Sequence, residues 1–452
     1  MEYALHPLLQ RDKVSGAGSL VLRFFRLKNP GDLVRRTYFW TVLSGGCFCA
    51  SSFLLLALII RLLGEYGPYW GGVFSIALVI SQQLITIGLF HMRSFQVSDV
   101  DEVFSFSDYF TSRVLTVVLM VAGGAVWIIA GGVGRDKAVA ILLLLALRAA
   151  ESFSDVFEGR YQQFGRLDIA SKGLFFKTLL PLGLFVIVLW LTRDMIVALA
   201  WMALLHWFLL VAADGFLMRS FARLEIRGSI RKQRRLLLSC LPLATNAFLF
   251  IYLNNLSRYA IDRFLDERQM TEYNALFMPS FLVILLSSFV LRPALTQLSR
   301  RCKEGDGRGF RLQIYIQLVW VAVFTVPTLV LAYAWGTPAL TLLYGIDLTP
   351  HRNALCVLIA GGALLSVYYV LQSILIILRR QMACLVGILL AALAGRAFTP
   401  YAVEHYGIPG GAYSFLFSAF LLSLIFMAMT VWYTRVASTE SIQHNGNPRH
   451  DP

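Results

Sequence analysis

Ionisable side chains within long apolar stretches are the residues of this chain best placed to do chemistry. Four arginines lie at such depth: Arg148, Arg258, Arg292 and Arg396. A charged group is costly there, so it tends to face a partner or a water-filled cavity. The planar guanidinium matches the oxygens of phosphate. Together these arginines place more cation than anion in the core, which predicts a site for an anionic, phosphate-bearing head group.

Acidic residues at the same depth are candidates for ion coupling. Glu151 and Asp155 follow Arg148 at i+3 and i+7, on one face of a helix, where they can pair along it. Asp214 lies in another apolar stretch. Two interpretations stay open, namely carboxylates that carry protons during transport and a self-neutralised cluster of structural ion pairs.

Motifs of enzymes and of metal or nucleotide sites are missing from the sequence. It contains no GxxxxGK[ST], no HExxH and no GxSxG. The six cysteines are scattered, and none forms a CxxC pair or a metal-ligand spacing with histidine. We therefore predict no catalytic residue, no metal and no cofactor, and hence a protein that is not an enzyme.

The composition identifies the elements that must hold these side chains. Of 452 residues, 58% are hydrophobic and 15% charged, with a mean hydropathy of +0.67, whereas soluble domains average about 25% charged residues. The chain is therefore predicted to be an all-α polytopic membrane protein. Stretches of about 20 apolar residues place twelve transmembrane helices at 38–62, 69–90, 111–130, 138–158, 173–192, 195–218, 237–262, 273–298, 312–335, 353–378, 383–404 and 410–434.

The distribution of Lys and Arg predicts the orientation of these spans. Twenty-nine cations are counted with the N-terminal segment, the even-numbered connections and the tail, against eight with the opposite connections. These counts include four arginines inside spans, each assigned to the nearer connection: Arg113 and Arg148 among the 29, and Arg258 and Arg396 among the eight. Cytoplasmic segments collect cations, so both termini are predicted to be cytoplasmic. The same rule accounts for the net charge of +14 without a nucleic-acid partner.

A short repeat predicts two pseudo-symmetric six-helix lobes. Residues 61–70 and 263–274 each combine a cation, two large apolar residues, a polar turn and a tyrosine that opens the next span. Parallel repeats of this kind are common in transporters, which bind substrate between the halves. The predicted segments are a cytoplasmic N-terminal segment (1–37), an N-terminal lobe (38–218), a basic cytoplasmic linker (219–236), a C-terminal lobe (237–434) and a cytoplasmic tail (435–452).

Several motifs resemble the polysaccharide transport family, which belongs to the superfamily of multidrug, oligosaccharidyl-lipid and polysaccharide exporters. They are Arg61-Leu62-Leu63-Gly64 with Tyr66-Gly67, Leu241-Pro242, the segment Arg148 to Arg166, and Tyr406-Gly407-Ile408-Pro409-Gly410-Gly411-Ala412. The resemblance covers about residues 35–435 and implies a MATE-like exporter fold.

The same resemblance implies a flippase in the bacterial cytoplasmic membrane. Its substrate would be an undecaprenyl-pyrophosphate-linked oligosaccharide for lipopolysaccharide O-antigen, capsule or exopolysaccharide, moved by rocking of the two lobes. Membrane lipids and the glycosyltransferases and polymerase of the same pathway are the implied partners. Arginines bind the diphosphate in related flippases, and Arg292 and Arg258 are the nearest counterparts here.

Three other functions remain open at this stage. A cation-coupled multidrug exporter of the same superfamily generally uses an acid in the first span, and residues 38–60 carry no charge. A polysaccharide polymerase or ligase generally has a large external loop, which the predicted topology lacks. A scaffold that recruits glycosyltransferases would leave the buried arginines without a purpose.

The segment 91–113 contains four acids, and the sequence assigns it no role.

Overall fold

The computed structural model describes residues 32–99, 101–218, 229–304 and 306–445, apart from the side chains of 49, 52, 292, 293, 296, 303 and 435–445. These residues form helices and turns, with no strand among them. The first helices are α3 (Leu33–Leu63), α4 (Gly67–Leu89), α5 (Met92–Ser98), α6 (Phe106–Gly131), α7 (Arg135–Gln163), α8 (Leu167–Thr192), α9 (Met195–Leu209) and α10 (Gly215–Met218). They are followed by α11 (Ile230–Phe264), α12 (Glu267–Phe277), α13 (Ser280–Lys303), α14 (Gly307–Leu331), α15 (Thr337–Tyr344), α16 (Arg352–Ile377) and α17 (Gln381–Asn445).

The helices form two compact units, here called unit 1 (Met1–Phe248) and unit 2 (Leu249–Pro452). The division falls inside α11, whose first half belongs to unit 1. Leu236 and Cys240 of this half are buried in a hydrophobic cluster with Tyr109 and Phe157, and this packing holds the start of α11 in unit 1. The predicted linker (219–236) ends before this division, and its residues 219–228 lie outside the described part of the chain.

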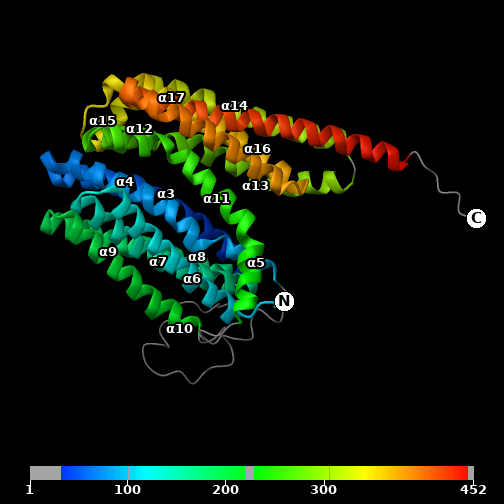
Figure 1. Cartoon of the computed structure of the whole chain (residues 1–452), viewed down its shortest axis with the longest axis horizontal. Helices are drawn as coiled ribbons and strands as arrows, with labels where there is room; N and C mark the ends of the chain where they lie inside the picture. Colours follow the sequence, from blue (N-terminus) through cyan, green and yellow to red (C-terminus); the bar gives the residue numbers. More distant parts are fainter. Residues whose placement is uncertain (1–31, 100, 219–228, 305, 446–452) are drawn as a thin grey trace, which may run out of the picture. The chain divides into compact units, whose positions relative to one another are not determined.

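Within each unit, helices distant in sequence pack side by side (Figure 1). In unit 1, α3 packs on α8, α4 packs on both α6 and α7, and α9 packs on α7 and α8. In unit 2, α16 packs on α13, α14 and α17. At least half of the residues of α4 and of α16 are buried, because each helix has neighbours on several sides.

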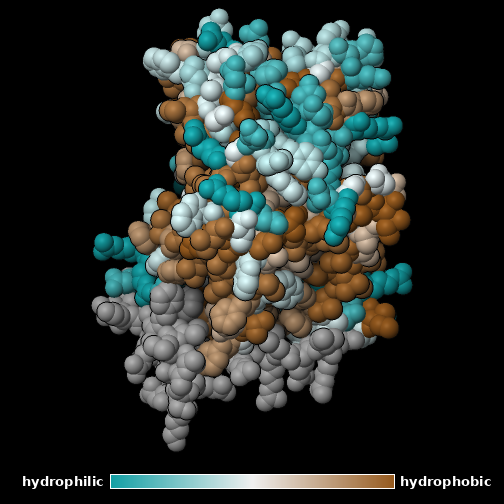
Figure 2. Space-filling view, turned by 90° about the vertical axis from the view of Figure 1, so that its left-hand side faces the viewer, coloured by the Kyte–Doolittle hydropathy of each residue, from teal (hydrophilic) through white to brown (hydrophobic). Residues whose placement is uncertain are grey.

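Nine stretches of the described chain are long and apolar enough to cross a membrane. The predicted spans lie on helical residues to within one residue, except that 273–298 crosses the turn at Met278 and Pro279 between α12 and α13. The count of twelve remains a prediction. Three of the nine stretches contain a break, including those at Gly64, at Met278–Pro279 and at Gly407, and α7 is not among the nine. Large apolar side chains such as Ile129 (81% exposed) face outward, and Figure 2 shows broad hydrophobic areas on the face it presents. These surfaces suit a lipid environment.

Two helical hairpins, one in each unit, share a backbone geometry that only glycine adopts readily. Gly64, between α3 and α4, has φ 59° and ψ −121°, and Gly407, within α17, has φ 60° and ψ −133°. A side chain is strained at such angles. Three residues later, Gly67 and Gly410 pack against backbone carbonyl oxygens of the preceding helix. The turn at 61–70 therefore matches the one near 407. At 263–274, by contrast, Asp266 caps α12 with its side chain.

Replacing Gly67 with alanine is expected to lower the thermal midpoint of unfolding of the purified protein. The added Cβ would clash with the Ile60 carbonyl oxygen, and such overpacking typically costs about 1–3 kcal/mol. Gly183→Ala is the matched control, because nothing lies within 4 Å of its added Cβ and alanine favours helix. Equal midpoints for the two variants would contradict the close approach at Gly67.

Candidate functional site

Three carboxylates line one face of α7 and organise the polar interior of unit 1. Glu151 binds Arg148 within the same helix at 2.6 Å. Asp155 and Glu158 lie one and two turns further along, and their side chains are 17% and 8% exposed. Arg148 is thus neutralised by Glu151, as the structural interpretation of this cluster requires. Asp155, however, pairs with residues of other helices.

Two arginines from outside α7 bind Asp155. Arg113 of α6 has a fully buried side chain and donates to Asp155 at 2.7 Å. Arg93 of α5 donates to Asp155 at 3.4 Å and to Glu158 at 2.9 Å. The predicted span 111–130 contains Arg113 close to its start, whereas α6 begins five residues earlier. Ser105 and Asp108 form a capping box that begins α6 at Phe106, so Arg113 lies two turns inside the helix.

A lysine joins Glu158 to the last carboxylate of the network. Lys177 of α8 donates to Asp214 at 2.8 Å and to Glu158 at 3.3 Å. Tyr161 also donates to Asp214, at 3.4 Å. Asp214 lies in a π-helical turn (Leu210–Asp214) between α9 and α10, a feature that is common at functional sites.

These eight charged side chains form what we call the unit 1 network, which is formally neutral. Its four cations match its four carboxylates: Arg93, Arg113, Arg148 and Lys177 against Glu151, Asp155, Glu158 and Asp214. Buried charges that are paired in this way hold helices together and leave no excess charge for an anion. No group of three or more His, Cys, Asp or Glu in the described chain could hold a metal ion.

Arg258 in unit 2 differs from every arginine of the unit 1 network. Its side chain is buried, its Nη1 donates to Asn255 at 2.9 Å, and its guanidinium carbon lies 3.9 Å from the ring centroid of Phe277. Its Nε and Nη2 have no hydrogen-bond partner. No carboxylate of the described residues pairs with it. An arginine with two vacant donors and no acid is suited to receive an anion.

Arg396 of α17 is also tied to α11, but at an exposed position. Its Nη1 donates to the Tyr252 hydroxyl at 2.8 Å, and Tyr252 stacks on Tyr259, the residue next to Arg258. Arg396 therefore contacts the part of α11 that contains Arg258. Arg292 belongs to α13, and its side chain lies outside the described part of the chain, so its role stays a prediction.

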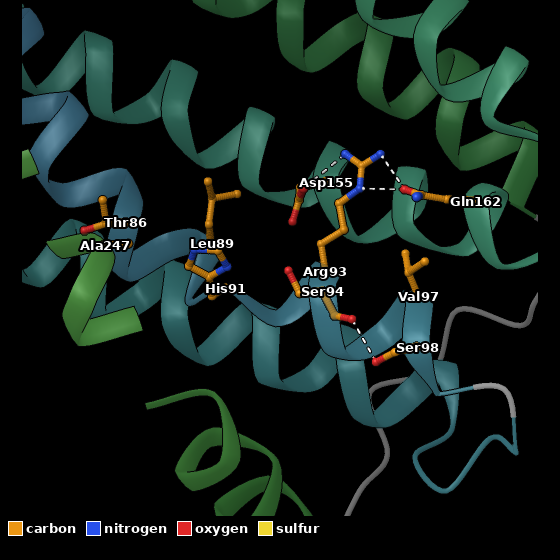
Figure 3. A pocket seen from close by; sticks show the side chains of 10 residues that line it. All are labelled: Thr86, Leu89, His91, Arg93, Ser94, Val97, Ser98, Asp155, Gln162 and Ala247. Carbon is orange, nitrogen blue, oxygen red and sulfur yellow. Dashed lines mark hydrogen bonds and ion pairs between the residues drawn. The ribbon is translucent and has the colours of Figure 1, made fainter. Parts of the chain in front are cut away.

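A cavity of about 500 Å³ opens in unit 1 beside the network. Its wall is formed by Thr86, Leu89, His91, Arg93, Ser94, Val97, Ser98, Asp155, Gln162 and Ala247. Figure 3 shows Arg93 reaching Asp155 and the Gln162 side-chain oxygen across this wall. Much of the wall belongs to the 91–113 segment, to which the sequence assigned no role.

Comparison with known proteins identifies a family whose sequence model matches this chain. Residues 71–350 match the family model described as "polysaccharide biosynthesis protein". No curated protein sequence matches the chain.

Solved structures of the same fold come from transporters. An inward-facing multidrug resistance MATE family transporter of the MOP superfamily is 12% identical, with a TM-score of 0.70 over 86% of this chain and 96% of its own. An outward-facing form has 13% identity and a TM-score of 0.58 over 94% and 100%.

A MOP superfamily transporter from Pyrococcus furiosus, described as having a binding pocket of reverse polarity, is 13% identical. Its TM-score is 0.57 over 94% of this chain and 99% of its own. At such low identities these likenesses establish the fold alone, and the family match rests on the sequence itself. The chain belongs to the polysaccharide biosynthesis protein family and is a multi-pass membrane protein with the fold seen in MATE transporters.

Proposed function

We propose that this transporter flips an undecaprenyl-pyrophosphate-linked oligosaccharide from the cytoplasmic to the outer leaflet of a bacterial cytoplasmic membrane. The glycan would serve O-antigen, capsule or exopolysaccharide synthesis, and both termini would be cytoplasmic. The family match supports a role in polysaccharide biosynthesis. The observation that carries the choice of substrate is Arg258, a buried arginine without a carboxylate partner.

The chemistry of Arg258 suits a diphosphate. Its vacant Nε and Nη2 can donate two parallel hydrogen bonds to phosphate oxygens, which is the strongest geometry available to a guanidinium. Arg396, exposed on α17, adds a second cation near the same stretch of α11. Arg148 is a weaker candidate for this role because it is bound to Glu151.

Ion coupling, in this proposal, involves Asp155 and Asp214 of the unit 1 network. Each binds a cation that comes from another helix, at 2.7 Å and 2.8 Å respectively. Protonation of either carboxylate would weaken a contact between helices, so a proton gradient could act on the packing of unit 1. Glu151, whose partner lies on its own helix, is the weaker candidate.

A cation-coupled multidrug exporter is the alternative function, because the solved structures with this fold include multidrug transporters. Those exporters generally use an acidic residue in the first span to couple transport to protons or sodium. Helix α3 carries no Asp or Glu along Leu33–Leu63, which favours the lipid-linked glycan.

Deletion of the gene tests the proposal in cells. Lipid-linked saccharides extracted from the deletion strain should accumulate in the cytoplasmic leaflet, with loss of surface glycan and no change in drug sensitivity. Normal surface glycan with raised drug sensitivity would favour the exporter. Finished single units on the outer face would instead favour a polymerase.

A further inference from the structure

Apart from Asp155, the side chains that build the unit 1 cavity have no role in the flippase proposal. α5 supplies Arg93, Ser94, Val97 and Ser98, and the turn before it supplies His91. The remaining wall comes from α4, α7 and the first half of α11. Its volume of about 500 Å³ falls within the range of small-molecule sites, about 300–1,000 Å³.

The charge on the cavity wall does not favour an anion. Arg93 is its one arginine, and that guanidinium already binds Glu158 at 2.9 Å and Asp155 at 3.4 Å. Asp155 itself lines the wall. A diphosphate would have to displace or approach these carboxylates, whereas a neutral ligand would not.

Hydrogen-bonding groups remain available on the same wall. The Gln162 side-chain oxygen accepts from Arg93, so its amide nitrogen can donate to a ligand. The side chains of His91 and Ser94 make no hydrogen bond within the described chain, and both residues are exposed. Donors and acceptors therefore lie on the same wall as the apolar side chains of Leu89 and Val97 (Figure 3).

The backbone between α4 and α5 is strained where it turns into this wall. Phe90 and His91 both have left-handed angles, φ 46° and φ 53°, which non-glycine residues adopt rarely. Strain of this kind persists where the surrounding structure fixes it, and it is concentrated at binding sites. Here it places His91 on the cavity wall.

We infer that this cavity binds the neutral sugar rings of the transported glycan, an inference that rests on the proposed function. Hydroxyl groups of a sugar both donate and accept, which matches a wall of amide, imidazole, hydroxyl and an ion pair. Leu89 and Val97 can cover the C–H faces of a ring. In the proposed orientation, the α4–α5 turn lies on the cytoplasmic side, where the glycan would be loaded.

Binding measurements on the full-length detergent-purified protein test this inference with two probes. One is the water-soluble glycan released by mild acid from the host's lipid-linked saccharides, and the other is inorganic pyrophosphate. Gln162→Leu should weaken glycan binding about two- to tenfold, the effect of one lost hydrogen bond. Ser94→Trp, which fills the cavity from α5, should weaken it at least about tenfold. Neither variant should change pyrophosphate binding.

Ser239→Trp is the matched control, since Ser239 is exposed on α11 and is not part of the cavity wall. Glycan binding equal to wild type in both Gln162→Leu and Ser94→Trp, or weakened equally in Ser239→Trp, would overturn the inference. Absence of glycan binding to the wild type would do the same. If the wild-type protein does not bind pyrophosphate, that result counts against the flippase proposal itself. Failure of the sugar-site inference and failure of the flippase proposal are therefore distinguishable.

Discussion

Arg258→Gln is expected to abolish flipping of the lipid-linked glycan while leaving the protein as stable as the wild type, or more so. Truncating one side of a buried charge contact typically costs about 2–5 kcal/mol of binding, or about 30-fold to several thousand-fold. In the free protein, however, Arg258 is buried without a carboxylate partner. Removing an uncompensated buried charge relieves a desolvation penalty, so the thermal midpoint should stay the same or rise.

Two variants sharpen this experiment. Arg258→Lys keeps the charge but loses the planar fork, so transport should fall between wild type and Arg258→Gln. Arg263→Gln, an exposed position on the same helix, should transport normally. A marked loss of stability in Arg258→Gln would show that Arg258 is a structural residue and not a substrate ligand.

Lys177→Met is expected to destabilise unit 1 strongly. Lys177 is the cation that joins Glu158 to Asp214, and all three side chains are at least nine-tenths buried. Breaking a buried pair by removing one partner costs about 3–5 kcal/mol, because a buried charge is left uncompensated. We expect a large fall in the thermal midpoint of the purified variant.

A double variant separates this cause from simple loss of packing. Lys177→Met combined with Asp214→Asn leaves Glu158 still bound to Arg93 and removes the unpaired carboxylate. The double variant should therefore be more stable than Lys177→Met alone. Its destabilisation should also fall short of the sum of the two single variants by an interaction energy of about 0.5–3 kcal/mol. A double variant that is less stable than the single one would contradict the network as described.

Much of the helical layout could be predicted from the sequence, because apolar stretches of membrane-spanning length are a strong signal. The predicted span 138–158 lies within α7, although charged residues keep α7 from being counted as a membrane span by composition. The pairing of Arg148 with Glu151 also follows from their i, i+3 spacing. In each case the information is local to one helix.

The rest of the network could not be predicted, because it depends on which helices are neighbours. Arg113 binds a carboxylate 42 positions away in sequence, and Lys177 binds one that is 37 positions away. The spacing of residues along the chain does not indicate contacts between different helices. One local signal was available: the Ser105-x-x-Asp108 capping box moves the start of α6 from the predicted 111 to 106 and places Arg113 two turns inside the helix.

The cavity in unit 1 shows the same limit. Its wall draws on α4, α5, α7 and α11, and no single stretch of sequence indicates it. The acids of the 91–113 segment are not among the residues that line the cavity. Asp99 and Asp108 hold the turn and the start of α6 through hydrogen bonds. The polar residues that line the cavity from this segment are instead His91, Arg93, Ser94 and Ser98.

Reconstitution into liposomes tests the central claim most directly. Lipid-linked saccharide is placed in one leaflet, and its appearance in the other is followed by oxidation of the sugar with periodate that does not cross the membrane. Transfer should exceed that of protein-free liposomes, increase with the amount of protein and be lost in Arg258→Gln but not in Arg263→Gln. Transfer no faster than in protein-free liposomes, by a wild-type protein that is folded and membrane-inserted, would contradict the assignment as a flippase.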